Sequence, residues 1–318
     1  MNGSQGSPRD DVSRFLSALE GEMNAFVPGE DIARSRAAFA AMLRRHDAPP
    51  RAPVTTRALH CPGPTGPMAL LLHDANDSAA GPRPVIVYFH GGGFMLGDSA
   101  CYADLCGELA AQTGLPVVSV DYRLAPEHPF PAAPDDCEAA ARWIAQAAPT
   151  LGVPATGLVL MGDSAGGNLA IVTAQALAAR PAALPVLLHV PVYPVAGPVG
   201  RHASYRAYRE GYLLTREALA RFHAAYAAPL DNPRHYPLLH PDHGRSPPAL
   251  VVTAECDPLR NSGREYAARL AEAGVACEAL EFSGAIHGFM TLRKAIPSAQ
   301  SDLETLTRAM TRLLERPA

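Results

Sequence analysis

Short runs of aliphatic and β-branched residues alternate with stretches of helical periodicity from about residue 53 onward. Such alternation is typical of a mostly parallel β-sheet that is covered by helices. The segment CPGPTGP separates the first two runs, and its proline and glycine residues predict a turn between antiparallel neighbours at one edge of the sheet. The runs predict eight strands, at residues 54–59, 68–73, 85–89, 117–121, 158–161, 186–190, 250–253 and 277–282.

Two segments do not fit this alternation. Residues 8–46 predict two helices separated at the sequence VPGED, and residues 195–245 predict a helix near 216–227 and then a loop rich in proline and histidine. Because neither segment builds the sheet, we expect one α/β domain over residues 1–318 with a helical cap formed by residues 1–50 and about 195–245. The connecting helices of the domain are expected at residues 102–112, 134–147, 165–179, 259–273 and about 298–314.

Composition and charge remove several classes of protein. With 27 lysine and arginine residues, 31 aspartate and glutamate residues and an apolar fraction of 48%, the chain is neither disordered nor a strongly basic nucleic-acid binder. Lys294 is the only lysine, which excludes a phosphate-binding loop with a Gly-Lys-Ser/Thr signature. The six cysteines form no CxxC pair and have no metal-ligand spacing, so we expect free thiols and no metal site.

The N-terminal sequence has neither a basic start nor an apolar run of signal-peptide length. No window offers about 18 consecutive apolar residues, the length that a membrane-spanning helix needs. We therefore expect no membrane span and a cytoplasmic location.

One serine lies in a glycine-rich segment between an apolar strand and a helix. The sequence from Gly162 to Gly166 reads GDSAG and fits the pattern G-x-S-x-G. Small residues around Ser164 permit the sharp turn that presents a serine hydroxyl above a sheet, with a helix N-terminus behind it. The alternative interpretation is an ordinary strand-to-helix turn with an idle serine.

Three consecutive glycines, Gly91, Gly92 and Gly93, follow His90 directly after the third expected strand. Glycine reaches positive φ and lets the backbone approach a ligand, so these amides can point at a developing oxyanion. A dinucleotide-binding pattern G-x-G-x-x-G fails here, because its last position is Leu96. A plain tight turn is the remaining alternative.

A nucleophilic serine needs a base, and the base needs a carboxylate that orients it. Asp257 follows the seventh expected strand, and His287 lies in a loop past the eighth. The chain order Ser164, Asp257, His287 is the order of α/β-hydrolases and differs from both serine-protease orders. Taken alone, each residue also has a non-catalytic interpretation, as an exposed loop aspartate or a packed histidine. Three suitable residues after three suitable strands favour a catalytic site.

Together these motifs identify a family resemblance. The chain resembles the hormone-sensitive-lipase family of esterases, the bacterial family IV, in its GDSAG subgroup. The resemblance implies an α/β-hydrolase fold with an eight-stranded, mostly parallel sheet flanked by helices. The matching pieces are HGGGF at 90–94, VSVDYRLAPEHPFPAAPDD at 118–136, GDSAGGNLA at 162–170, DPLR at 257–260 and HGF at 287–289.

The resemblance also implies roles for the site residues. Ser164 is then the nucleophile, His287 the general base and acid, and Asp257 the residue that orients it. The oxyanion hole is expected from the amides of the glycine loop and of Ala165. Its expected members are Gly91, Gly92, Gly93 and Ala165, with Gly92 and Gly93 favoured within the loop and His90 as a structural support.

The resemblance further implies a substrate class and an oligomeric state. It implies short- to medium-chain acyl esters as substrates, without a metal or an organic cofactor, and it suggests a homodimer through the edge of the sheet. One departure is Asn261-Ser262, where the family usually has acidic residues after DPLR. This departure leaves open the loop or substrate contacts at that point.

Several other residues could take part in a site. Glu255 competes with Asp257 as the triad acid, but Asp257 is the later residue and lies beyond the strand end, where sites in such sheets form. Asp163 is expected to stabilise the turn. A solvated loop is favoured over a metal cluster for His235, His240, His243, Asp231 and Asp242. Helix packing is favoured over a pocket role for Tyr205, Tyr208, Tyr212, Phe222 and Tyr226.

Three hypotheses of different classes follow from these residues. The first, which we favour, is a carboxylic-ester hydrolase acting through an acyl-enzyme. The second is an amidase or another acyl hydrolase on the same triad. The third is a non-catalytic small-molecule binder on the same fold, and the intact triad positions argue against it.

Overall fold

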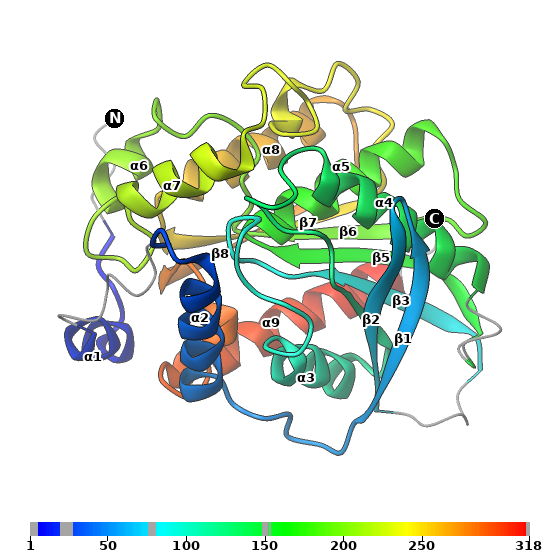
Figure 1. Ribbon diagram of the computed structural model, residues 1–318, viewed down its shortest axis with the longest axis horizontal. Helices are drawn as coiled ribbons and strands as arrows, with labels where there is room; N and C mark the ends of the chain where they lie inside the picture. The colour runs from blue at the N-terminus through cyan, green and yellow to red at the C-terminus, as the bar shows by residue number, and fades with distance from the viewer. Residues whose placement is uncertain (1–5, 20–27, 76–80, 148–151, 153, 316–318) are drawn as a thin grey trace.

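Among the residues that the structure describes, eight strands form one sheet through the middle of the molecule (Figure 1). The structure is a computed structural model, and it describes residues 6–19, 28–75, 81–147, 152 and 154–315. The strands lie in the order β1-β2-β4-β3-β5-β6-β7-β8. Their bounds are Thr55–Gly63 (β1), Gly66–Asp74 (β2), Arg83–Phe89 (β3), Val117–Val120 (β4), Ala155–Asp163 (β5), Val186–Val192 (β6), Ala249–Cys256 (β7) and Cys277–Ile286 (β8).

Strand direction divides the sheet into two parts. β1 pairs with β2 and β2 with β4 in antiparallel register, whereas all pairs from β4 through β8 are parallel. The predicted antiparallel edge and the mostly parallel sheet are both confirmed. Because the parallel strands end on the same side, the loops that follow β3, β5, β7 and β8 gather there.

Both faces of the central strands are buried, which explains their continuous apolar runs. In β3, Ile86 and Tyr88 belong to the core on one face, and Val85, Val87 and Phe89 belong to the core on the other. All five side chains are almost fully buried. A single register slip would exchange the two sets, so this strand has a strongly specified register.

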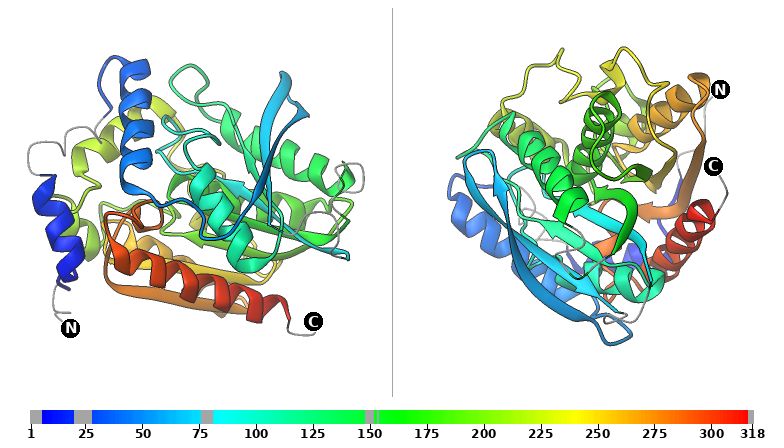
Figure 2. Two further views of the ribbon diagram at one scale, coloured as in Figure 1. Left: turned by 90° about the horizontal axis from the view of Figure 1, so that it is seen from below. Right: turned by 90° about the vertical axis from the view of Figure 1, so that its right-hand side faces the viewer.

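Helices cover each face of the sheet. Figure 1 places α4, α5 and α8 on one face and α3 and α9 on the other, and Figure 2 shows α9 lying along the sheet when it is seen from below. In the described part of the chain, no helix is long and apolar enough to span a bilayer. The bounds of the helices that cover the sheet are Ala103–Thr113 (α3), Ala132–Ala147 (α4), Ala165–Ala179 (α5), Arg260–Glu272 (α8) and Pro297–Leu314 (α9).

The segments expected to form a cap occupy two different places. Helices α2 (Ile32–His46) and α7 (Arg216–Tyr226) supply side chains to the cavities at the strand ends, and the short helix α6 (Ala203–Tyr208), which the periodicity did not predict, precedes α7. Helix α1 (Asp10–Ala18) lies instead beside β8 and α9. Residues 1–5 and 20–27 of the expected cap lie outside the described residues.

Specific hydrogen bonds hold α1 at the edge of the sheet. The Arg9 amide donates to the Gly284 carbonyl (3.2 Å), and the Arg9 guanidinium binds the Asp302 carboxylate (2.6 Å). The Asp11 carboxylate accepts from the Ser298 amide (2.8 Å). The N-terminal segment therefore contributes one helix to the edge of the sheet and one, α2, to the site.

Candidate active site

Ser164 lies at the sharp turn that joins β5 to α5. Its backbone has φ 56° and ψ −115°, a conformation that residues other than glycine rarely adopt. Its backbone amide donates to the Val192 carbonyl (2.8 Å). The turn approaches β3 so closely that a Cβ on Gly166 would overlap the Phe89 carbonyl oxygen. Glycine at 166 thus permits the geometry that lifts the Ser164 hydroxyl above the sheet.

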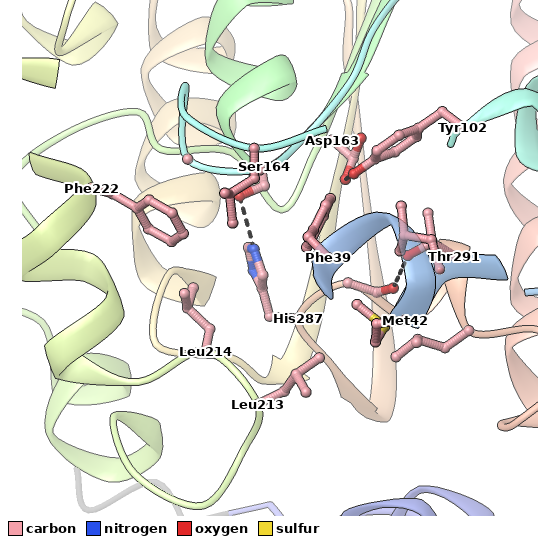
Figure 3. Close-up of a pocket in the computed structure, with 16 residues that line it drawn as sticks. Phe39, Met42, Tyr102, Asp163, Ser164, Leu213, Leu214, Phe222, His287 and Thr291 are labelled. Carbon is pink, nitrogen blue, oxygen red and sulfur yellow. Dashed lines mark hydrogen bonds between the residues drawn. The ribbon is translucent and has the colours of Figure 1, made fainter. Parts of the chain in front are cut away.

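A continuous chain of hydrogen bonds joins Ser164, His287 and Asp257 (Figure 3 shows the first two residues). His287 Nε2 lies 2.9 Å from Ser164 Oγ, and its Nδ1 lies 2.8 Å from Asp257 Oδ2. Because an ionised carboxylate only accepts, Nδ1–H donates to Asp257, which leaves Nε2 to accept the serine proton. Asp257 is fully buried, and its Oδ1 accepts from the Leu259 amide (2.7 Å).

The structure places Glu255 away from this chain of hydrogen bonds. Its Oε2 accepts from the Ser283 hydroxyl (2.7 Å) and from the Gly284 amide (2.8 Å). These bonds hold Glu255 against β8, whereas Asp257 reaches His287. Asp257 therefore lies within hydrogen-bond distance of His287, and Glu255 has its own partners on β8.

Aromatic rings support the His287 imidazole from the side of β6. Tyr193 follows β6 with φ 36° and is fully buried, and its ring centroid lies 4.7 Å from that of His287. Phe289 in turn packs against Tyr193 at 5.5 Å. Burial raises the pKa of the Tyr193 hydroxyl, so this side chain is neutral beside the imidazole. Sequence analysis missed Tyr193, whose only signal was its position directly after a strand.

The glycine loop presents unpaired amides near Ser164. Gly92 has φ 110° and Gly93 has φ 63°, and the Gly92 carbonyl accepts from the Leu96 amide (2.9 Å), which closes the turn. Within the described residues, the amides of Gly92, Gly93 and Ala165 donate no hydrogen bond. These three amides are therefore available for an oxyanion.

The expectation for Gly91 needs correction. Its amide donates to Asp163 Oδ1 (2.8 Å), so it cannot also serve as an oxyanion donor. The Tyr88 hydroxyl donates to the same oxygen (2.8 Å), and the Tyr102 hydroxyl donates to Oδ2 (3.2 Å). Burial raises the pKa of Asp163, while these hydrogen bonds favour the carboxylate. Asp163 thus ties the glycine loop to the turn that carries Ser164.

His90 occupies the place expected of a structural support. It is buried and stacks on Tyr122, with ring centroids 4.3 Å apart. Its Nδ1 lies 2.8 Å from the Gly91 carbonyl oxygen, to which it donates as a neutral ring, because burial lowers the pKa of His90.

The two residues that depart from the family pattern make hydrogen bonds to the segment between β6 and α7. Ser262 is fully buried, and its hydroxyl accepts from the amides of Ala196 (2.9 Å) and Gly197 (3.1 Å). The backbone N–H of Asn261 donates to the Ser204 hydroxyl (3.2 Å). These contacts fix the start of the segment that leads from β6 to α7.

Two cavities meet at Ser164. The first, which we call the α2 pocket, measures about 80 Å³, and the second, the α7 pocket, measures about 240 Å³. The α2 pocket is lined by Phe39, Met42, Leu43, Gly92, Gly93, Leu96, Tyr102, Asp163, Ser164, Leu213, Leu214, Phe222, His287, Gly288, Thr291 and Leu292. The α7 pocket is lined by Gly93, Phe94, Ser164, Val195, Gly197, Val199, Gly200, Tyr205, Leu214, Arg216, Leu219, Ala220, Phe222, His223, Tyr226, His235, Tyr236 and Leu259.

These linings refine the expectations for aromatic and histidine residues. Tyr208 is buried as a helix-packing residue, whereas Tyr205 and Tyr226 line the α7 pocket and Phe222 lines both pockets. His235 is also buried and lines the α7 pocket, so the expectation of a solvated loop is wrong for this residue. Among the described residues, no three histidine, cysteine, aspartate or glutamate side chains are grouped to hold a metal ion.

Comparisons with known proteins show which family the chain resembles. A family model described as the alpha/beta hydrolase fold matches residues 86–291. The chain is 39% identical to an ethyl acetate hydrolase of Pseudomonas putida, over 76% of this chain and 76% of that protein. It is 38% identical to the carboxylesterase NlhH of Mycobacterium tuberculosis, over 68% of this chain and 69% of that protein.

A solved structure extends the likeness to most of the molecule. It is an ester hydrolase from the metagenome of Lake Arreo, complexed with a derivative of bipyridine phosphonate. The two structures superpose with a TM-score of 0.89 at 34% sequence identity, and the match covers 96% of this chain and 98% of that chain.

Proposed function

The chain belongs to the hormone-sensitive-lipase family of α/β hydrolases and is a carboxylesterase, and from this premise we propose that Ser164, His287 and Asp257 are its catalytic triad. The observation that carries this proposal is the hydrogen-bond chain from Ser164 Oγ through His287 to the buried Asp257 carboxylate. The nucleophile at its head lies where two cavities meet.

Acylation is the first half of the proposed reaction. His287 Nε2 accepts the hydroxyl proton as Ser164 Oγ forms a bond to the ester carbonyl carbon, and the carbonyl π electrons move to its oxygen. The amides of Gly92, Gly93 and Ala165 stabilise the resulting oxyanion, while Asp257 stabilises the imidazolium. His287 then protonates the leaving oxygen as its bond to carbon breaks, which releases the alcohol.

Deacylation repeats these steps with water. The acyl group is now an ester of Ser164. A water molecule attacks the carbonyl carbon of this ester, and His287 accepts a proton from the water. The same amides hold the second oxyanion. When this intermediate collapses, the serine oxygen recovers its proton from His287 and the carboxylic acid leaves.

We propose short- to medium-chain acyl esters as the substrates. Cavities of about 80 and 240 Å³ offer room for small groups on each side of the ester. The similarity to an ethyl acetate hydrolase supports the same size class. Helices α2, α6 and α7 form the proposed cap over this site. Phe39 of α2 and Phe222 of α7 are among the cap residues that line the α2 pocket.

The test is the activity of a Ser164→Ala variant toward p-nitrophenyl butyrate. We expect kcat to fall by about 10⁴-fold or more, because the alanine cannot form the acyl-enzyme. Ser301→Ala, which removes an exposed hydroxyl on α9, is the matched control and should retain activity. A Ser164→Ala protein with wild-type turnover, or a wild-type protein inactive on a panel of such esters, would refute the assignment.

Location and assembly stay predictions. The six free cysteine thiols, five of them buried, support a reducing compartment such as the cytoplasm. A homodimer through the sheet edge rests on the family resemblance and is testable by the mass of the protein in solution.

A further inference from the structure

The α2 pocket and the α7 pocket open on opposite sides of the same nucleophile. They share Gly93, Ser164, Leu214 and Phe222, and their other lining residues differ. The α7 pocket has about three times the volume of the α2 pocket. An ester carries an acyl chain on one side of its carbonyl carbon and an alcohol group on the other, so each pocket can receive one of these two parts.

Phe222 lies at the boundary between the two pockets. Its ring, which projects from α7, faces Ser164, whereas Phe39 and Met42 of α2 lie on the other side of the serine in the same view (Figure 3). The ring packs so tightly on the glycine loop that a Cβ on Gly93 would overlap it. The benzyl group therefore separates the cavities directly beside the expected oxyanion donors.

The position of His287 distinguishes the two pockets chemically. His287 and its neighbours Gly288, Thr291 and Leu292 line the α2 pocket, and none of them lines the α7 pocket in the described chain. The leaving oxygen takes its proton from His287 Nε2, so it has to lie within hydrogen-bond reach of that atom. The alcohol part of the ester consequently extends toward the α2 pocket, which leaves the α7 pocket for the acyl chain.

We infer that Phe222 is a specificity-determining wall, with the leaving alcohol on its α2 side and the acyl chain on its α7 side. The inference rests on the proposed function and adds to it which part of the ester each pocket receives. The preferred substrates are alkanoate esters of small alcohols, in which the acyl chain is the longer part. The apolar side chains of Val195, Val199 and Leu219 suit an alkyl chain in the α7 pocket.

Two ester series measure the pockets separately. In the acyl series the alcohol is always methanol, and the acid runs from acetate through butyrate and hexanoate to octanoate. In the alcohol series the acid is always acetate, and the alcohol runs from methanol to octanol. For the wild-type protein, kcat/KM should fall at a shorter chain length in the alcohol series than in the acyl series. The reverse order would overturn the assignment of the pockets.

A crossover of two narrowing variants tests the same assignment independently. Leu219 lines only the α7 pocket and Met42 only the α2 pocket, among the residues described. We expect Leu219→Trp to lower kcat/KM for methyl octanoate by about tenfold or more relative to methyl acetate, with the alcohol series unchanged. Met42→Trp should do the opposite, and each variant is the control for the other.

Methyl acetate separates a failure of this inference from a failure of the proposed function. A variant that hydrolyses methyl acetate at the wild-type rate has a folded, working triad, so an unchanged or exchanged chain-length profile in that variant overturns the inference alone. An inactive wild-type protein would instead refute the proposed function.

A third variant keeps the inference testable where a tryptophan prevents folding. Phe222→Ala removes the wall, so we expect activity on octyl acetate to rise by about tenfold relative to methyl acetate as the pockets merge. An unchanged alcohol series in a folded Phe222→Ala protein, shown by wild-type melting, would overturn the role of Phe222.

Discussion

Gly166 packs against the end of β3 with no room for a side chain. An alanine Cβ at this position would overlap the Phe89 carbonyl oxygen and lie 2.6 Å from the His90 carbonyl oxygen. Both neighbours are backbone atoms, so relief requires movement of the strand that leads into the oxyanion loop. The cost of such overpacking is about 1–3 kcal/mol.

We therefore expect Gly166→Ala to lower the free energy of unfolding by about 3 kcal/mol and to lower kcat by displacing the oxyanion amides from Ser164. Urea denaturation and turnover of p-nitrophenyl butyrate measure the two effects. Gly81→Ala is the matched control, because nothing lies within 4 Å of a Cβ at Gly81. Wild-type stability and activity in Gly166→Ala would contradict the packing described here.

At the residue scale, sequence could predict those site residues that follow strands. Ser164, Asp257 and His287 each come directly after an apolar run, and the structure brings them together. Gly91 was misassigned because the partner of its amide, Asp163, lies 72 positions along the chain. No local pattern distinguishes an amide that is paired over that distance from one that is free to bind an oxyanion.

Helix α2 is bound to the oxyanion loop through one side chain. Arg36 donates from Nε to the Met95 carbonyl (2.9 Å) and from Nη2 to the Ala125 carbonyl (3.1 Å), and it also binds the Glu127 carboxylate. The Met95 amide donates in turn to the Gly92 carbonyl (3.1 Å). Arg36 therefore joins a wall of the α2 pocket to the turn that holds the proposed oxyanion donors, and we expect it to act as a positioning residue.

We expect Arg36→Ala to lower kcat by about tenfold with a smaller change in KM, because misplaced oxyanion donors weaken binding of the transition state more than binding of the ester. Steady-state kinetics with p-nitrophenyl butyrate measure both parameters. Arg36→Lys should recover part of kcat, since an ammonium can still donate to the Met95 carbonyl. Arg34→Ala, at an exposed position of the same helix, is the control. A change confined to thermal stability would contradict a positioning role.

At the element scale, the apolar runs were sufficient to predict the strands and the connecting helices. Helix α6 was missed because its six residues include tyrosines and an arginine but no repeating apolar face. The separation of α1 from α2 was also beyond the sequence pattern. Both helices have apolar faces, and only long-range contacts such as that of Arg9 with Asp302 decide where each one packs.

Three buried histidines make the stability of the whole molecule sensitive to acid. Burial lowers the pKa of His73, His189 and His235 to about 4, from an ordinary value of 6.5. His189 lies between the Pro248 carbonyl (3.0 Å) and the Tyr266 hydroxyl (2.9 Å). Below pH 6.5 the unfolded chain binds protons that the folded protein does not, so stability is complete above pH 6.5 and falls toward pH 4.

Each such histidine should lower the free energy of unfolding by about 2 kcal/mol between pH 6.5 and pH 5. Urea denaturation at pH 7 and pH 5 measures the total. In His189→Gln the difference between the two values should shrink by about 2 kcal/mol, whereas His60→Gln, at an exposed position of β1, should leave it unchanged. Equal stability of the wild-type protein at both pH values would rule out this source of acid sensitivity.

The walls of the two pockets come from stretches of the chain that are far apart in the gene. Residues 39–43 supply one side and residues 195–222 most of the other, while the triad and the oxyanion loop lie outside both stretches. Two short mutagenic cassettes, one over residues 39–43 and one over residues 195–205, would therefore vary the two ends of the ester independently, because neither stretch contains the residues Leu214 and Phe222 that line both pockets. Libraries built this way can be screened one cassette at a time and then recombined, so acid and alcohol selectivity can be evolved as separate traits.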